Sequence, residues 1–129
     1  MENELELIKL IKTVLGYDIV ELMDYTLRDK ISIFKSYETI IQQSSASNVN
    51  ILFTGKNTNN VIISNPRIGP WMNYKLQQYS TMVGCNLFTI DEAEELTSHD
   101  HTIADINNLP WRLTDVHGVV ELIASINNL

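Results

Sequence analysis

One segment decides the fold: residues 61–88, which read VIISNPRIGPWMNYKLQQYSTMVGCNLF. Its β-branched start belongs to a strand that we expect over Asn60–Ser64, and its end enters a second strand over Asn86–Ile90. Between them, prolines and a glycine predict an irregular connection up to Pro70, where a helix begins that ends at Gly84. A strand–helix–strand unit of this kind favours right-handed parallel pairing of the two strands.

Toward the N-terminus, the patterns predict a further strand and a helical segment. Val49–Thr54 is a β-branched and aromatic run, and residues 55–59 have the composition of a hairpin loop leading into the next strand. Glu4–Leu15 has the periodicity of an amphipathic helix that ends at Gly16. A second helical pattern begins near Asp18, and over residues 29–41 helix and strand remain alternatives.

Toward the C-terminus, Thr114 is expected to cap a final helix with an apolar stripe. At 129 residues, the chain has the size of one globular domain, spanning residues 1–129. We expect an α/β (or α+β) fold: a small mixed sheet of three to four strands, with an N-terminal helical segment and a C-terminal helix packed on it. The stripe consists of Val116, Val119, Val120, Ile123 and Ile126.

Composition indicates the cellular compartment in which the protein is found. Cys85 is the only cysteine, so no internal disulfide can form, and the acidic Met1–Glu4 start does not resemble a secretory leader. No apolar stretch approaches the roughly 20 residues that span a bilayer. We therefore expect a cytoplasmic protein that does not enter a membrane.

The negative charge is concentrated in the last third of the chain. The net charge is −7, which argues against attraction to nucleic acid or to anionic lipid. Residues 1–90 hold eight acids and eight bases, whereas residues 91–129 hold eight acids and Arg112 alone as a base. This distribution favours a basic protein as the partner.

Several of these acids are predicted to form one surface. Asp91, with Glu94 three residues later, has the capping-box pattern of a short acidic helix, although such charges also stabilise a helix start by themselves. A tryptophan beside Pro and Arg, as at Trp111 and at Trp71, is typical of interface anchors and also of core positions. The predicted partner-binding residues are Asp91, Glu92, Glu94, Glu95, Asp100, Asp105 and Trp111.

Motifs for chemistry are weak. His99 and His101 could be metal ligands, with His117 as a third, but their polar surroundings favour a solvated loop, so we expect no metal. Gly55-Lys56 lacks the upstream glycine of a phosphate loop, and Cys85 has acidic rather than basic residues downstream. We therefore assign no catalytic residues and no cofactor, which leans against an enzyme.

The sequence leaves three functional hypotheses. The first is a small acidic binding module that neutralises a basic partner, such as a nuclease-type toxin or a defence protein. The alternative is a small α/β enzyme or anionic-ligand-binding domain, with its site near the carboxyl ends of the strands at Lys56, Asn65 and Arg67. The third is an assembly subunit that oligomerises through its helix stripes, and the oligomeric state is left open.

The C-terminal tail supports the first hypothesis. Residues 109–116, LPWRLTDV, contain a Trp and a Thr-Asp cap and precede a short final helix. Over about 20 residues, this pattern resembles the C-termini of contact-dependent-inhibition immunity proteins. The resemblance implies a cognate cytosolic toxin as the partner, and it assigns no particular interface residue.

Overall fold

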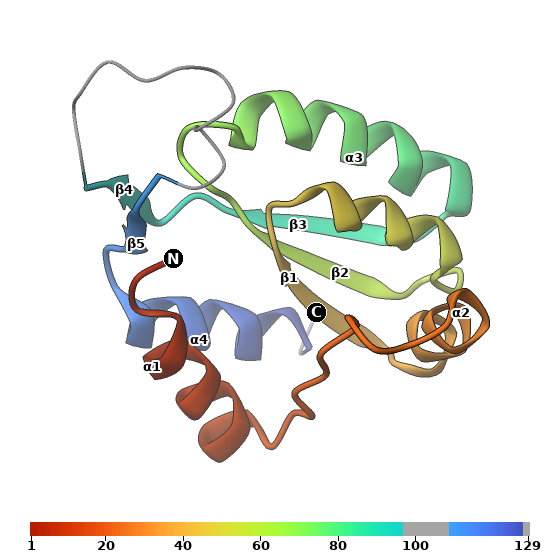
Figure 1. Cartoon of the computed structure of the whole chain (residues 1–129), viewed down its shortest axis with the longest axis horizontal. Coiled ribbons are helices and arrows are strands. Elements are labelled where there is room, and N and C mark those ends of the chain that lie inside the picture. Colours follow the sequence, from red (N-terminus) through yellow and green to blue (C-terminus); the bar gives the residue numbers. More distant parts are fainter. Residues whose placement is uncertain (97–108, 128–129) are drawn as a thin grey trace.

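The computed structural model describes residues 1–96 and 109–127 (Figure 1). As predicted, the fold is α/β. The helical elements are α1 (Glu4–Leu10), η1 (Ile11–Leu15), α2 (Leu27–Ser36), η2 (Ala46–Phe53), α3 (Gly69–Val83) and α4 (Val116–Ile126). The strands are β1 (Thr39–Gln43), β2 (Asn59–Ile63), β3 (Asn86–Ile90), β4 (Ala93–Glu95) and β5 (Trp111–Leu113).

The main sheet contains β1, β2 and β3 in that order, and all three strands are parallel. In its register Ile41 lies opposite Val61, which lies opposite Phe88. Because the chain crosses the sheet in one direction, both connections, through η2 and α3, lie on the same face (Figure 1). The predicted strand–helix–strand unit is confirmed, whereas antiparallel pairing occurs only in the separate β4–β5 sheet of the described chain.

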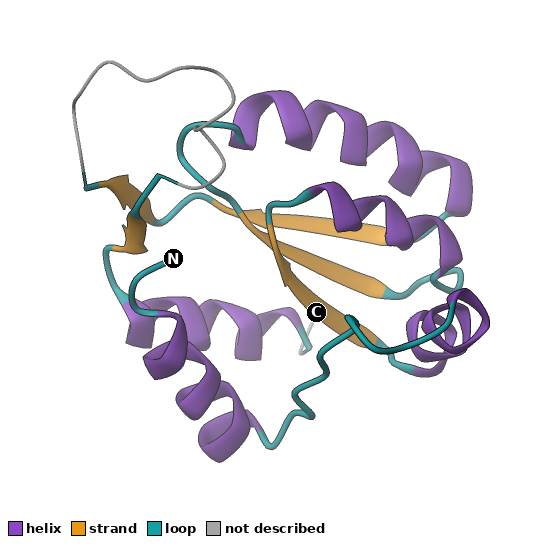
Figure 2. Ribbon diagram, in the orientation of Figure 1, coloured by secondary structure: helices purple, strands orange, loops and turns teal. Residues whose placement is uncertain are grey.

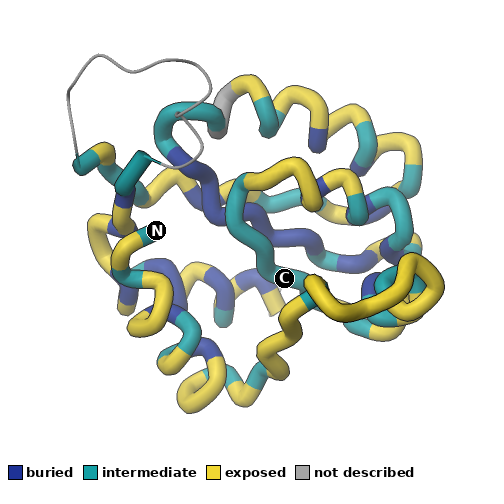
Figure 3. The backbone as a smooth tube through the Cα atoms, in the orientation of Figure 1, coloured by how far each residue is buried: buried dark blue, intermediate teal, exposed yellow. Residues whose placement is uncertain are grey.

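Helices α1 and α4 cover the opposite face of the sheet, so the molecule has three layers (Figure 2). The alternating side chains of β2 fill both interfaces. Val61 and Ile63 belong to the larger core cluster with α1 and α4, while Ile62 packs with Ile51 of η2 and Leu76 of α3. The buried positions therefore line the centre of the molecule on both sides of β2 (Figure 3).

The strand predicted over Val49–Thr54 is wrong, and so is the hairpin. Residues 49–53 belong to the 3-10 helix η2 and Thr54 is its C-cap; in this helix Ile51 is fully buried while Val49 is exposed. Asn48, in the first turn of the helix, holds its start: the Asn48 side-chain oxygen accepts from the N–H of the N-cap Ser45 at 2.8 Å, and its Nδ2 donates to the Gln43 carbonyl at 2.9 Å. This buried amide holds the chain in a turn where the residue types alone favour a strand.

The N-terminal helix is confirmed, and its last turn is the π-helical η1, which ends where Gly16 adopts the left-handed conformation (φ 70°). The second helix does not begin at Asp18. It begins after Thr26, whose hydroxyl accepts from the Asp29 N–H at 3.2 Å. Residues 29–41 contain both alternatives in succession, because α2 ends at Ser36 and β1 follows.

The final helix is confirmed, with its cap one residue later than predicted. Asp115, not Thr114, is the N-cap, and its Oδ1 accepts from the Gly118 N–H at 2.9 Å. All five residues of the predicted stripe are buried. Of the helices in the described ranges, none combines the length and the apolar character needed to cross a membrane.

Candidate functional site

The acidic stretch after β3 forms a strand rather than a capped helix. Glu94 and Glu95 belong to β4, which pairs antiparallel with β5. Glu94 lies opposite Arg112, and its Oε1 is 2.6 Å from the Arg112 Nε. The predicted acidic helix is therefore wrong, because a cross-strand partner far along the chain competes successfully with the local capping pattern.

Arg67 holds this small sheet in place, and Asn65 supports Arg67. The Arg67 side chain is only 6% exposed, its Nη1 donates to the Pro110 carbonyl at 2.9 Å, and its Nε lies 3.8 Å from Glu95 Oε1. Asn65 is buried as well, and its side-chain oxygen accepts from the Arg67 N–H at 3.0 Å. The Arg67 side chain therefore connects the loop after β2 to the β4–β5 sheet, and the Asn65 side chain holds the backbone of that loop at Arg67.

Lys56 does not join Asn65 and Arg67. It precedes β2, at the amino end of the strand, whereas Asn65 and Arg67 follow the carboxyl end. The Lys56 side chain passes beside Gly84, where an added Cβ would lie 3.5 Å from Lys56 Cγ. The prediction that these three residues converge is therefore wrong. It depended on a strand over Val49–Thr54, which would have placed Lys56 at a carboxyl end, and this segment is helical instead.

The two tryptophans differ in exposure. Trp111 is 4% exposed and belongs to the larger core cluster, so its burial does not match the expectation of a surface anchor. Trp71, at the start of α3, is 61% exposed, and the Lys75 Nζ lies 4.1 Å from the centre of its ring. The two tryptophans, each with a proline before it and an arginine nearby, thus have different exposure, which is decided by packing.

Four predicted residues lie outside the described residues: Asp100, Asp105, His99 and His101. Within the described ranges, no group of three His, Cys, Asp or Glu side chains is arranged to hold a metal ion. Cys85 is buried beside Ser80, in agreement with its interpretation as a core residue.

The N-terminal segment packs on the small sheet and adds to its charge. The Glu2 N–H donates to the Trp111 carbonyl at 2.8 Å, and the Asn3 side chain donates to and accepts from Leu113, both at 3.0 Å. Exposed carboxylates from both ends of the sequence are thereby brought to the sides of β5. We call this surface the acidic end; it contains Glu2, Asp91, Glu92, Glu94, Glu95 and Asp115.

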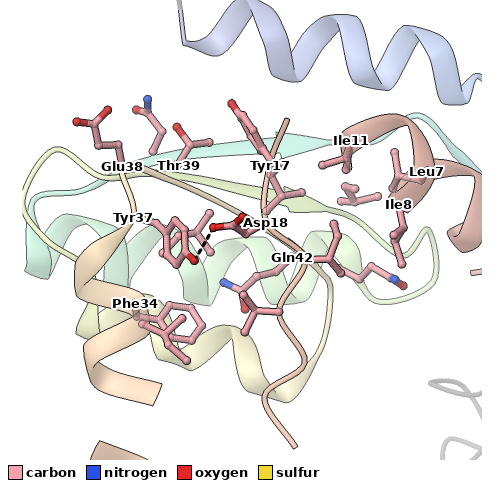
Figure 4. A pocket seen from close by; sticks show the side chains of 18 of the residues that line it. Leu7, Ile8, Ile11, Tyr17, Asp18, Phe34, Tyr37, Glu38, Thr39 and Gln42 are labelled. Atoms are coloured by element: carbon pink, nitrogen blue, oxygen red, sulfur yellow. Dashed lines mark hydrogen bonds between the residues drawn. The ribbon is translucent and has the colours of Figure 1, made fainter. Parts of the chain in front are cut away.

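A groove along β1 is the feature that sequence reasoning missed. It has a volume of about 650 Å³ and lies between α1, α2 and the segment 16–22, with β1 as its floor (Figure 4). Leu7 and Ile8 of α1 and Ile11 of η1 line one side, and Phe34 of α2 lines the other. No motif marks this groove, because its walls come from four separate parts of the chain.

The segment 16–22 is held beside β1 at two points. The Asn127 Nδ2 donates to the Tyr17 hydroxyl, and the Tyr37 hydroxyl donates to Asp18 Oδ2 at 3.0 Å. The hydrogen bond to Asp18, together with its negative charge, raises the pKa of Tyr37. Tyr37 therefore remains a neutral donor at physiological pH, while Asp18 contributes a negative charge to the rim.

Comparison with family models, curated proteins and solved structures gives no match to this chain. Its function is therefore inferred from the acidic end and the groove themselves.

Proposed function

We propose that this chain is a cytoplasmic protein-binding module that neutralises a basic protein partner, as an immunity protein or inhibitor of a nuclease-type toxin or defence protein does. The observation that carries the proposal is the acidic end. Docking of the N-terminus adds Glu2 to the carboxylates of the last third of the chain, and the neighbouring exposed cation, Arg112, is already paired with Glu94.

The charges of the acidic end are available to a partner. Among the described residues, no ion-pair partner reaches Glu2, Asp91 or Glu92, and all three are exposed. A carboxylate-rich surface attracts a cationic protein over distances of about a Debye length, roughly 8–10 Å at physiological salt. Such a surface can cover the cationic cleft with which a nuclease holds its substrate.

The anion-binding alternative has less support. Its two proposed cations are at opposite ends of β2, and Arg67 is engaged by Pro110 and Glu95. No specific observation favours an enzyme, so the binding module is the function that the geometry supports best.

Affinity capture from the native host tests the proposal. We expect a basic protein that is retained at low salt and released as the salt concentration rises. The variant Asp91→Asn/Glu92→Gln should slow association with that protein by roughly tenfold, because surface charges act mainly on the association rate. The control Asp24→Asn/Glu121→Gln removes the same charge from exposed sites elsewhere and should leave the rate nearly unchanged.

Two results would contradict this function. One is a captured partner that is neutral or acidic, or whose retention does not depend on salt. The other is equal slowing of association by the two double variants, which would assign the effect to net charge rather than to the acidic end.

A further inference from the structure

β1 is an edge strand with unpaired backbone groups. Glu38 accepts through its carbonyl from Asn59, and Ser44 donates through its N–H to Ile63, so even-numbered residues of this strand are bonded to β2. The N–H and C=O groups of Thr39, Ile41 and Gln43 therefore point away from the sheet. Within the described chain, only the Gln43 carbonyl among them has a partner, the Asn48 side chain.

The groove lies along this unpaired edge. All five residues of β1 line it, and none of them is fully buried, in contrast to the four buried residues of β2. Five residues of strand extend over about 16 Å. The groove therefore presents a row of donors and acceptors at strand spacing, between apolar walls.

The charge of the groove has one sign. Among the described residues, its lining includes the carboxylates Glu4, Asp18 and Glu38 and no Lys, Arg or His. Glu4 accepts from the Gln43 side chain at 2.6 Å, at the end where α1 leads back to the acidic end. An occupant that carries positive side chains is favoured along its whole length.

We propose that this groove binds an extended, basic segment of a protein partner by strand addition to β1. The added backbone bonds to Ile41 and to the Gln43 N–H, its apolar side chains alternate into the walls, and its Lys or Arg side chains meet Glu4, Asp18 and Glu38. This inference rests on the proposed function, because it takes the partner to be a basic protein. It adds which part of that partner is recognised.

Hydrogen exchange of the unliganded protein gives the first test. The amides of Ile40 and Gln42 should exchange slowly, whereas those of Ile41 and Gln43 should exchange at least tenfold faster, because their N–H groups are unpaired. Protection of Ile41 and Gln43 in the free protein would mean that the segment 16–22 or a second copy already occupies the edge, and it would overturn the proposal.

The second test uses random peptides displayed on phage and selected on the intact protein. We expect enriched peptides that alternate apolar with basic residues, and whose binding protects the Ile41 and Gln43 amides. Enrichment of no peptide, or of peptides that bind without changing these amides, would overturn strand addition. The second result would indicate a pocket for a compact ligand, which its volume also permits.

Matched proline variants distinguish a loss of peptide affinity caused by the β1 edge from one caused by a general disturbance of the fold. Ile41→Pro and Gln43→Pro each remove one unpaired N–H and should weaken the selected peptide by roughly tenfold, as the loss of a backbone hydrogen bond does. Thr89→Pro removes an outward N–H from β3, the opposite edge of the sheet, and should change affinity by less than about twofold. Equal losses in all three variants would contradict the proposal, and circular dichroism verifies that each one is folded.

The two proposals can fail separately. If the captured partner depends on Asp91 and Glu92 but is unaffected by Ile41→Pro and Gln43→Pro, strand addition fails and the acidic binding module stands. If peptides bind β1 as described but capture gives no basic protein, the groove stands and the neutralising function fails.

Discussion

β1 and β2 are neighbouring strands of equal length with similar apolar content, yet they have different surroundings. β2 is hydrogen-bonded on both sides, and its residues Asn60–Ile63 are buried. β1 is bonded on one side, and each of its residues keeps partial exposure. The central strand is committed to the core, whereas the edge strand keeps backbone groups and apolar side chains that a partner can use.

The difference shows where stability and binding are separated in this molecule. The side chains of β2 reach both core clusters, so a change there affects two layers at once. On β1, Ile41 packs only against the margin of the larger cluster. Variants in the two strands should therefore have opposite consequences for folding and for recognition.

The largest effect is expected from truncation in the central strand. Ile62→Ala empties a fully buried site and should lower the free energy of unfolding by about 2–5 kcal/mol. Ile41→Ala, the matched change on β1, should cost less than half as much, because its site is partly open to water and needs no closed cavity. Urea unfolding of both variants measures this, and equal losses would remove the distinction between the strands.

A smaller effect is expected from proline at adjacent positions of β1. Gln42→Pro removes an N–H that the register directs to the Val61 carbonyl, and it should cost about 1–3 kcal/mol for the unsatisfied acceptor. Gln43→Pro removes an N–H at the open edge and should cost less than about 1 kcal/mol. Thermal unfolding compares the pair, and Gln43→Ala accounts for the loss of the side-chain bond to Glu4.

If Gln43→Pro destabilises the protein as much as Gln42→Pro, then the edge is already paired, and β1 is not the open strand that its bonding pattern indicates.

The same contrast explains what could be predicted from the sequence. β2, α3 and β3 have strong local signals: a β-branched run, a proline near the helix start and the glycine at 84, which adopts φ 82°. β1 has only five residues, two of them glutamines, and it follows α2 closely. Its alternation of apolar and polar residues is therefore too short to identify a strand. A buried central strand can therefore be predicted from its apolar, β-branched composition, whereas a half-exposed edge strand cannot.

The wrong secondary-structure predictions have a common physical origin: interactions with other parts of the chain outweigh the local sequence pattern. The acidic turn at Asp91 has a capping-box sequence, but Arg112 and the β5 backbone pair with it across 18 residues of sequence. Val49–Thr54 has strand composition, but Asn48 satisfies the Gln43 carbonyl and bends the chain into η2.

The candidate site also has one part that the sequence predicts and one part that it does not. The concentration of acids was visible as a charge count, and the contribution of Glu2 required knowing that the N-terminus packs on Trp111. The groove could not be predicted at all. Its three carboxylates are separated by 14 and 20 positions in the sequence, at residues 4, 18 and 38, and only the fold brings them to one strand edge.

The smallest effect concerns the rim of the groove. Asp18→Ala removes both the hydrogen-bond acceptor and the negative charge that raise the pKa of Tyr37, so this pKa should fall toward the ordinary tyrosine value of about 10. Since the folded-state pKa is the raised one, the Tyr37–Asp18 bond contributes fully below pH 10 and is lost as the pH rises through the folded value.

The ring resonances of Tyr37, followed by NMR during an alkaline titration, measure this shift directly. Because the pair is exposed, global stability should hardly change. The expected consequence is local: the amides of residues 18–22 should lose their shift change between neutral and alkaline pH in Asp18→Ala and in Tyr37→Phe alike. An unchanged Tyr37 pKa in Asp18→Ala would mean that the segment 16–22 is not held to the edge strand by this bond, and the wall of the groove would then depend on Tyr17 and Asn127 alone.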